Sequence, residues 1–509
     1  MSGIEINVNG EAVVVEDDTA TLLAVLREQV GAVSVKDGCS PQGQCGCCTV
    51  LVDGQPRVSC VTPVRRVRGR SITTVEGLSS DVRSSWGDAF AATGGSQCGF
   101  CTPGIVCRFE GLRAKGVGHD DRAKAADALL AHLCRCTGWQ SIVDAWEAYG
   151  TPVSLGSSDA AAARAVLEGG VAQAVGTDVA LGEGGFADDT APDDSLVAVP
   201  DGDGWAVAET RAAALAAAGK IQGRRTTATF EPPIDLPAGD FDAVLRTTWT
   251  EPAYLETDAS WCAPGGEPAS LLGNGGAFGG KVESDLGSVA RRLADQHGRP
   301  VRVLLAREDV VRRGPKRPPV AAGMNADGTG VIRVARTDGI AEVIAAYAPS
   351  VTVEEVDVVG PPTSAAIRGA GWLEVAVLAA AARGEVGWIA GPGGGEATAA
   401  ISPDGSVQVR VRAGESLDDI TLRSYCVGAA HMGLGLVRSE SIAVDPETGE
   451  IHDLTIRSFG VLRAVDTPRV EVVIEPDDHP AVNGSDAVMA AVAAAAWIDA
   501  GTPTTWPTG

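Results

Sequence analysis

The chain has 509 residues, a formal net charge of -25 and a hydrophobic fraction of 45%. This length predicts about three domains, and the hydrophobic content suffices for globular cores. The acidic excess argues against nucleic acid or an anionic membrane as a partner, and the alanine-rich run 487–496 is too short to span a bilayer. The first eight residues lack the basic flank and apolar run of a secretory signal. We therefore expect a cytoplasmic enzyme or electron carrier.

Residues 1–79 have the pattern of a small β-grasp domain. Residues 4–15 alternate apolar and polar side chains around Asn9-Gly10, which predicts a hairpin. Apolar residues at helical spacing follow in 22–30, and the pattern of 49–60 predicts a second hairpin. Two hairpins around one helix, with a cysteine-rich loop beside them, are typical of a plant-type ferredoxin-like domain.

A first set of four cysteines lies in this domain. Cys39, Cys45, Cys48 and Cys60 are separated by short, glycine-containing stretches. Four thiolates, flexible backbone and nearby amide donors are what a [2Fe–2S] cluster requires. The first gap holds five residues where the plant-type ferredoxin pattern has four. The two-residue spacing from Cys45 favours Cys48 over Cys47 as the third ligand.

A second set of cysteines lies in a region of helical pattern, residues 80–152. The ligands expected there are Cys98, Cys101, Cys134 and Cys136. Thr102-Pro103 predicts a helix start directly after the first pair, which places the thiols in loops between helices. Zinc is the alternative for four cysteines, but the tight C-x-C pair beside a ferredoxin-type set favours a second [2Fe–2S] cluster.

The remaining residues predict a mixed α+β region. Gly, Ala, Ser and Asp dominate residues 153–205, which indicates a linker. Alanine-rich helical stretches then alternate with strand-like ones, and we expect two subdomains, 206–345 and 346–509. The predicted fold class is therefore multidomain α+β: a β-grasp [2Fe–2S] domain, a helical-bundle [2Fe–2S] domain and a mixed α+β region.

Two glycine-rich segments leave the backbone bare in this last region. Residues 273–283 read Gly-Asn-Gly-Gly-Ala-Phe-Gly-Gly-Lys-Val-Glu. Val282 stands where a P-loop needs Ser or Thr, and Phe278 stands where a dinucleotide fingerprint needs glycine. The segment instead suits close approach by a flat or phosphorylated cofactor, with a glycine-rich turn that binds nothing as the alternative. Residues 366–372 form the second segment.

Three motifs in the first 150 residues are specific. They are Cys-Gly-Cys-Cys-Thr-Val at 45–50, Gln-Cys-Gly-Phe-Cys-Thr-Pro-Gly at 97–104 and Leu-Cys-Arg-Cys-Thr-Gly at 133–138. In these motifs the chain resembles the molybdenum hydroxylases, the xanthine oxidase and aldehyde oxidase family. The resemblance implies two [2Fe–2S] clusters that relay electrons between a molybdopterin site and a flavin. No flavin domain is recognised in the chain, so it also implies a flavin-containing partner subunit or other electron acceptor, within an oligomer.

The resemblance continues, in shorter pieces, into the second half. Residues 246–264, the two glycine-rich segments and the tail 437–497 are similar to the family's molybdenum-binding part. This similarity implies that a molybdopterin would be lined by five residues: Gln97, Gly276, Phe278, Gly279 and Arg368. It further implies a small-molecule substrate, an aldehyde or an N-heterocycle, that is hydroxylated.

The sequence departs from the family where catalysis is concerned. The family's catalytic glutamate takes a proton from a metal-bound hydroxyl and lies in a Gly-Glu-Pro motif near the C-terminus. That place reads Asn-Gly-Ser-Asp-Ala-Val at 483–488, so Asp486, which is one methylene shorter, is the candidate in its place. The whole region is also shorter than the family's usual molybdenum domains. One hypothesis is a hydroxylase-type oxidoreductase, and the other is an electron-transfer or assembly subunit with a vestigial molybdenum domain.

Overall fold

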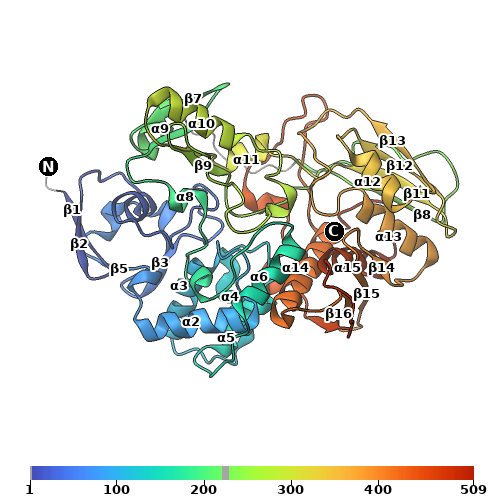
Figure 1. Ribbon diagram of the computed structural model, residues 1–509, viewed down its shortest axis with the longest axis horizontal. Coiled ribbons are helices and arrows are strands. Elements are labelled where there is room, and N and C mark those ends of the chain that lie inside the picture. Colours follow the sequence, from blue (N-terminus) through green and yellow to red (C-terminus); the bar gives the residue numbers. More distant parts are fainter. Residues whose placement is uncertain (1–2, 220–227, 509) are drawn as a thin grey trace.

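The computed structural model describes residues 3–219 and 228–508. These residues form four sheets with helices packed between them. The N-terminal sheet lies at the left of Figure 1, and the C-terminal one lies at the lower right. None of the described helices is both long and apolar enough to cross a membrane. The multidomain α+β class expected from the sequence is confirmed.

The first sheet is the β-grasp sheet that the two hairpin patterns predict. Its strands are β1 (Ile4–Val8), β2 (Glu11–Val15), β3 (Thr49–Val52), β4 (Gln55–Val58) and β5 (Ser71–Thr73). Their order is β2-β1-β5-β3-β4, with both hairpins antiparallel and β1 parallel to β5. Helix α1 (Leu22–Ala24) and the π-helical turn η1 (Val25–Gln29) bury Leu22 and Leu26 in the same core. The cysteine-rich loop connects η1 to β3.

Four α-helices of the described chain build the second domain. They are α2 (Ser80–Thr93), α3 (Thr102–Arg113), α4 (Arg122–Ala128) and α5 (Gln140–Ala148). Their core is aromatic, with the ring of Trp86 stacked 5.6 Å from Phe109 and 6.2 Å from Trp146. The indole N–H of Trp86 donates to the buried carboxylate of Glu110 at 2.5 Å. Helix α3 begins at Thr102, directly after Cys101, as the sequence predicts.

The segment 153–205, expected to be a linker, is largely folded. It holds α6 (Ser158–Gly169), α7 (Thr177–Ala180), α8 (Ala187–Thr190) and strand β6 (Leu196–Asp201). Helix α6 buries Ala161 and Ala165, and the guanidinium of its buried Arg164 donates to two backbone carbonyls of the C-terminal region. Alanine and glycine serve both flexible chain and closely packed helices, so their abundance alone does not separate the two.

Two mixed sheets form the middle of the chain. Their strands are β7 (Gly204–Ala208), β8 (Ala243–Arg246), β9 (Ala259–Cys262), β10 (Val301–Leu304), β11 (Val320–Met324), β12 (Gly330–Ala335) and β13 (Val351–Val356). One sheet has the order β7-β6-β10-β9 and the other has the order β13-β12-β11-β8. The helices beside them are α9 (Arg211–Ala218), α10 (Leu286–His297), α11 (Arg307–Arg313), α12 (Ile340–Tyr347) and α13 (Trp372–Arg383). Because β13 pairs with β12, the subdomain boundary expected at residue 345 falls inside one sheet.

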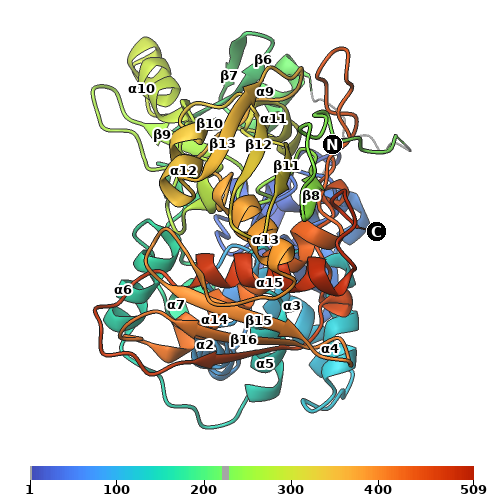
Figure 2. The ribbon, with the colours of Figure 1, turned by 90° about the vertical axis from the view of Figure 1, so that its right-hand side faces the viewer.

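The fourth sheet packs on two long, buried helices, α14 (Asp419–Arg438) and α15 (Ser485–Asp499). Its order is β14 (Ile389–Ala390), β15 (Glu396–Ile401), β16 (Val407–Arg412) and β17 (Val470–Ile474). Figure 2 shows α14 and α15 beside β15 and β16. A Cβ atom at Gly433 would lie 2.5 Å from the carbonyl of Met489, and one at Gly428 would lie 1.7 Å from the carbonyl of Cys136. Helix α14 therefore contacts α15 on one side and the second cysteine set on the other.

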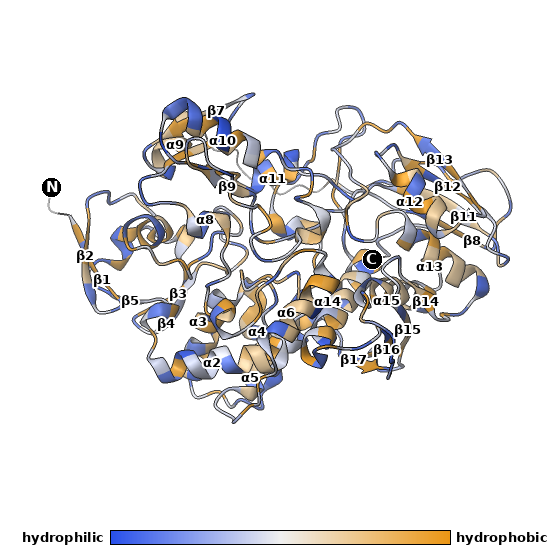
Figure 3. Ribbon diagram, in the orientation of Figure 1, coloured by the Kyte–Doolittle hydropathy of each residue, from blue (hydrophilic) through white to orange (hydrophobic). Residues whose placement is uncertain are grey.

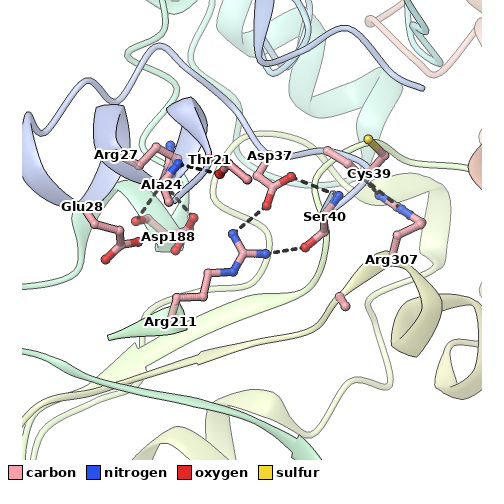
Figure 4. A network of polar contacts seen from close by, with 12 residues as sticks. Thr21, Ala24, Arg27, Glu28, Asp37, Cys39, Ser40, Asp188, Arg211 and Arg307 are labelled. Atoms are coloured by element: carbon pink, nitrogen blue, oxygen red, sulfur yellow. Dashed lines mark hydrogen bonds and ion pairs between the residues drawn. The ribbon is translucent and has the colours of Figure 1, made fainter. Parts of the chain in front are cut away.

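Two arginines outside the β-grasp domain clamp the loop that carries Cys39. Arg211, the first residue of α9, binds the carboxylate of Asp37 at 2.6 Å. Arg307, the first residue of α11, donates to the carbonyl of Gly38 at 2.8 Å. Figure 4 shows these two guanidinium groups reaching the same loop from the second sheet and its helices. The first cysteine set is therefore positioned in part by residues more than a hundred positions away.

Replacing Gly428 by alanine tests whether α14 holds the second cysteine loop. In an exposed helix interior, alanine in place of glycine adds about 1 kcal/mol of stability. Here the added methyl group would overlap the Cys136 carbonyl, so we expect Gly428→Ala to lower the free energy of unfolding by about 3 kcal/mol and to reduce iron content. Chemical denaturation and iron analysis measure both effects. Gly287→Ala on α10, where the nearest atom is 3.4 Å away, is the matched control; equal stability of the two variants would contradict the role of Gly428.

The buried His431 predicts a pH dependence of stability. Burial, followed by the charge of Arg135, lowers its pKa to about 4. The unfolded chain binds a proton near pH 6.5 and the folded chain binds it only near pH 4, so stability is lost as the pH falls through this window. We expect His431 to account for a loss of about 2 kcal/mol between pH 6.5 and pH 5 in urea denaturation. His431→Gln should remove this part of the slope, whereas His297→Gln at an exposed position should leave the slope unchanged.

Candidate functional site

The structure brings together the four cysteines of the first set, three from the loop between η1 and β3 and Cys60 from the turn after β4. Each is at most 2% exposed. The thiol of Cys39 contacts those of Cys45 and Cys60, and the thiol of Cys60 contacts that of Cys48. The amide N–H of Gln42 points at the sulfur of Cys39 at 3.2 Å. Four thiols and an amide donor thus surround one small space, as a [2Fe–2S] cluster requires.

Cys47 also lies at this site. Its side chain is fully buried, and its sulfur lies 3.8 Å from the carbonyl oxygen of Cys45 and contacts the Cys45 thiol. Proximity therefore does not separate Cys47 from Cys48. The choice of Cys48 as the ligand stays a prediction that rests on spacing.

The thiols of the second set meet in two pairs. The sulfurs of Cys98 and Cys136 are 3.7 Å apart, and Cys101 contacts Cys134. A hydrogen bond from Cys101 lowers the pKa of the Cys134 thiol to about 6, and the same contact raises the pKa of Cys101. In residues 3–219 and 228–508, no group of three or more His, Cys, Asp or Glu side chains is arranged to hold a single metal ion. Tetrahedral metal–thiolate bonds of about 2.3 Å place two sulfurs about 3.8 Å apart, so the Cys98–Cys136 pair has the spacing of two thiolates on one iron.

The two cysteine sets touch through their backbones. The N–H of Leu133 donates to the carbonyl of Cys45 at 2.9 Å. A Cβ atom at Gly104, in the first turn of α3, would lie 2.4 Å from the carbonyl of Gly46, so glycine is required for this approach. One hydrogen bond therefore separates Cys45 of the first set from the residue that precedes Cys134 of the second.

A cavity of about 250 Å³ lies beside the second set, and all four thiol-bearing residues of that set line it. The five residues that the family resemblance assigns to the cofactor line the same cavity, together with the candidate proton acceptor: Gln97, Gly276, Phe278, Gly279, Arg368 and Asp486. These residues come from the helical domain, the middle of the chain and the C-terminal region. The structure therefore gathers in one place every residue predicted for the cofactor.

The two glycine-rich segments form one wall of this cavity because they pack against each other. Phe278 has a φ of 53° and Gly279 a φ of 86°, both in the left-handed region. A Cβ atom at Gly279 would lie 1.9 Å from the carbonyl of Ala366, and the N–H of Arg368 donates to the carbonyl of Phe278 at 3.0 Å. A side chain at position 279 would push the segments apart.

Arg368 and Asp486 form an ion pair in the cavity wall. The Nε of Arg368 lies 2.7 Å from the Oδ1 of Asp486, and its Nη2 lies 2.5 Å from the hydroxyl of Ser485. Asp486 stands in the first turn of α15. One oxygen of the candidate proton acceptor is therefore already bound by a guanidinium group.

Sequence reasoning missed Glu168, which also lines the cavity. Its carboxylate accepts the N–H groups of Gly484 at 3.1 Å and Ser485 at 2.9 Å, at the start of α15. A carboxylate at a helix N-terminus satisfies unpaired amides and the helix dipole. The only local signal is its spacing of four residues from Arg164, and that spacing is common on solvated helices.

Two buried polar atoms in the wall have no hydrogen-bond partner among the described residues. They are the Nε2 of Gln173 and the Oε1 of Glu256. Burial raises the pKa of Glu256 to about 7, against the opposing effect of Lys281, whose Nζ lies 2.6 Å from the other carboxylate oxygen. Buried polar atoms of this kind are normally satisfied, and a polar ligand in the cavity would satisfy them.

Comparison with known proteins accounts for the N-terminal domains. The family model "2Fe-2S iron-sulfur cluster binding domain" matches residues 4–67, and "[2Fe-2S] binding domain" matches residues 74–147. The small FeS subunit of nicotinate dehydrogenase from Eubacterium barkeri is 38% identical over 141 residues, which are 27% of this chain and 88% of that subunit. The aldehyde oxidoreductase of Megalodesulfovibrio gigas is 41% identical over 149 residues. The chain belongs to the molybdenum hydroxylase family. The assignment of two [2Fe–2S] domains is thereby confirmed.

The remainder of the chain shares its fold with an aldehyde oxidoreductase. The crystal structure of the aldehyde oxidoreductase from Desulfovibrio desulfuricans matches with a TM-score of 0.69 and 15% identity, over 98% of this chain and 97% of that one. At that identity the likeness shows the fold alone. By sequence, the matched segment spans only 16% of the M. gigas aldehyde oxidoreductase.

Iron content per chain tests the ligand assignments. Two binuclear clusters hold about four irons. We expect Cys48→Ala and Cys101→Ala to retain about two irons each, because one cluster loses a ligand, and Cys47→Ala to retain about four. Cys107→Ala, at a buried cysteine outside both sets, is the matched control. Loss of iron in the Cys47 variant together with retention in the Cys48 variant would reverse the ligand assignment.

Proposed function

We propose that this chain relays electrons through its two [2Fe–2S] clusters, between a molybdopterin site in the cavity and an external flavin subunit or other acceptor. The observation that carries the proposal is the lining of the cavity by the second cysteine set. The hydrogen bond from Leu133 to Cys45 supports the next step, because it joins the second set to the first. Electrons that leave the cavity would therefore reach the second cluster and then the first.

The residues of the cavity suit a pterin. The bare backbone of residues 275–279 admits a flat ring, and the unpaired polar atoms of Gln173 and Glu256 would bind its heteroatoms. The amide of Gln97 is held in place by the hydroxyl of Ser424 at 3.0 Å and the carbonyl of Cys136 at 3.1 Å. When bound, the molybdenum cofactor would supply the oxygen-transfer chemistry that hydroxylates an aldehyde or an N-heterocycle. The chain's own residues would orient the cofactor and place it beside the second cluster.

The ion pair between Arg368 and Asp486 favours a second candidate function. Hydroxylation needs a group that accepts a proton, and Asp486 stands where the family places its glutamate. An oxygen of Asp486 is bound by Arg368 at 2.7 Å. The second candidate is therefore an electron-transfer or assembly subunit whose molybdenum domain is not catalytic.

Metal analysis of protein made in a host that synthesises the molybdenum cofactor distinguishes the two. For the hydroxylase-type relay we expect about four irons and about one molybdenum per chain. A panel of aldehydes and N-heterocycles, added without oxygen, should then bleach the visible absorption of the clusters. Asp486→Asn should slow this bleaching by about 100-fold or more with metal content unchanged.

Other outcomes decide against parts of the proposal. Four irons with no molybdenum would favour the second candidate. Bleaching at the wild-type rate in the Asp486 variant would instead indicate another proton acceptor. Fewer than about two irons, with zinc in their place, would contradict the electron relay itself.

A further inference from the structure

A stretch of the β-grasp domain carries positive charge in an otherwise acidic chain. Residues 54–75 contain five arginines and neither aspartate nor glutamate, whereas the whole chain has a net charge of -25. All five arginines are exposed, and Figure 3 colours most of β4 as hydrophilic. We refer to these side chains as the arginine patch: Arg57, Arg65, Arg66, Arg68 and Arg70.

Most of the patch is unneutralised. Two of its members make exposed contacts, one with the carbonyl of Asp18 at 3.5 Å and one with the carboxylate of Asp53 at 3.1 Å. The guanidinium groups of the other three, Arg57, Arg66 and Arg68, make no hydrogen bond or ion pair with any described residue. Arg57 and Arg66 line the same hollow, and like charges close together without counter-charges create a local positive potential.

The patch borders an apolar hollow of about 590 Å³. Arg57 and Arg66 line it, together with Val61, whose side chain is 57% exposed. A large apolar side chain at that exposure, with two unpaired cations beside it, has the make-up of a small protein interface: an apolar centre with a polar rim. The chemistry of this surface fits a partner that presents an apolar contact ringed by carboxylates.

The same surface adjoins one ligand of the first cluster along the chain. Cys60 stands within the arginine-rich stretch and is 2% exposed, and the exposed Val61 is its direct neighbour. None of the first-set cysteines lines the cofactor cavity, whereas all four cysteines of the second set do. The relay therefore has one end at the cavity and the other end beneath the arginine patch.

We propose that the arginine patch is the docking face for the external electron acceptor, and that this acceptor is an acidic redox protein. The inference rests on the proposed electron relay and adds to it the place and the charge of the partner. In each encounter, one electron would pass from the reduced first cluster, held by Cys39, Cys45, Cys48 and Cys60, to the oxidised centre of the partner, and no bond in this chain would form or break. An acidic partner is repelled by most of this chain and attracted at the patch, so the charges orient the encounter as well as hold it.

Rapid mixing of dithionite-reduced holoprotein with two protein acceptors of opposite charge tests the proposal. The acidic acceptor is a flavodoxin, and the basic one is cytochrome c. In Arg57→Glu with Arg66→Glu, we expect the second-order rate constant with flavodoxin to fall by about 10-fold or more at low salt, and the rate with cytochrome c not to fall. Raising the salt should shrink the difference.

The matched control is Arg292→Glu with Arg312→Glu, two exposed arginines outside the patch that give the same change in net charge. This control should alter the flavodoxin rate by less than about 2-fold, because screening confines the effect to nearby charges. Equal slowing in both double variants would overturn the docking face, and so would an unchanged flavodoxin rate in the patch variant. Preferential loss of oligonucleotide binding in the patch variant, with the flavodoxin rate intact, would assign the patch to nucleic acid instead.

A small neutral quinone separates failure of docking from failure of the relay. It needs no docking face, so all variants should reduce it at the wild-type rate. Clusters that dithionite does not reduce, or that no acceptor reoxidises, would contradict the relay itself, and the docking inference would fall with it. Iron content equal to that of the wild type shows that the substitutions leave the clusters intact.

Discussion

Buried guanidinium groups hold the loops that carry the cluster thiols. A buried carbonyl in a loop outside helices and strands needs a donor from elsewhere in the molecule. Arg307 supplies one to Gly38 at 2.8 Å. Arg135, which lies between Cys134 and Cys136 in the sequence, is itself held by Glu440 at 2.8 Å. Arginine suits such positions because its five donors lie in one rigid plane. Removing the side chain would leave buried carbonyls unpaired, which costs about 1–3 kcal/mol of stability for each carbonyl.

These contacts make the second half of the chain a scaffold for the clusters. Arg307 belongs to α11 and Glu440 follows α14, and both act on loops of the first 150 residues. The close approach of α14 to Cys136 at Gly428 adds a third link. This role does not depend on turnover of a substrate. The scaffold is thus compatible with both candidate functions. Measurements of stability therefore do not distinguish the two functions, whereas the molybdenum content does.

The parts of the structure that could be predicted are those with local causes. The turn at Asn9-Gly10 and the spacing of the cysteines are set within a few residues, and the β-grasp sheet and both thiol sets follow from them. Family motifs pointed to the cofactor residues, but no local pattern in the sequence predicts that these residues line the same cavity. Gln97 and Asp486 line one cavity only because α14 packs against the helical domain and α15 packs against α14.

The differences between prediction and structure also have a physical cause in distant contacts. The composition of residues 153–205 suggests a linker because it does not reveal what Arg164 binds. The carbonyls that accept its hydrogen bonds lie about 250 and 320 positions later in the chain. Glu168 escapes notice for the same reason, since its partners begin α15. The pairing of β13 with β12 crosses the expected boundary at residue 345 because a parallel pair carries no turn signature in the sequence.

The ion pair in the cavity bears on whether a cofactor can bind there. The side chains of Arg368 and Asp486 are 11% and 26% exposed, so the pair is partly hydrated. A pair of this kind contributes about 1 kcal/mol, or about 2 kcal/mol where its hydrogen bonds are well aligned. Affinities in the nanomolar range correspond to about 12 kcal/mol, and a ligand that also satisfies Gln173 and Glu256 would recover part of the cost of opening the pair. The Arg368–Asp486 contact is therefore too weak to keep a cofactor out. Its effect would be on catalysis, because Arg368 must release the carboxylate oxygen of Asp486 before that oxygen can accept a proton.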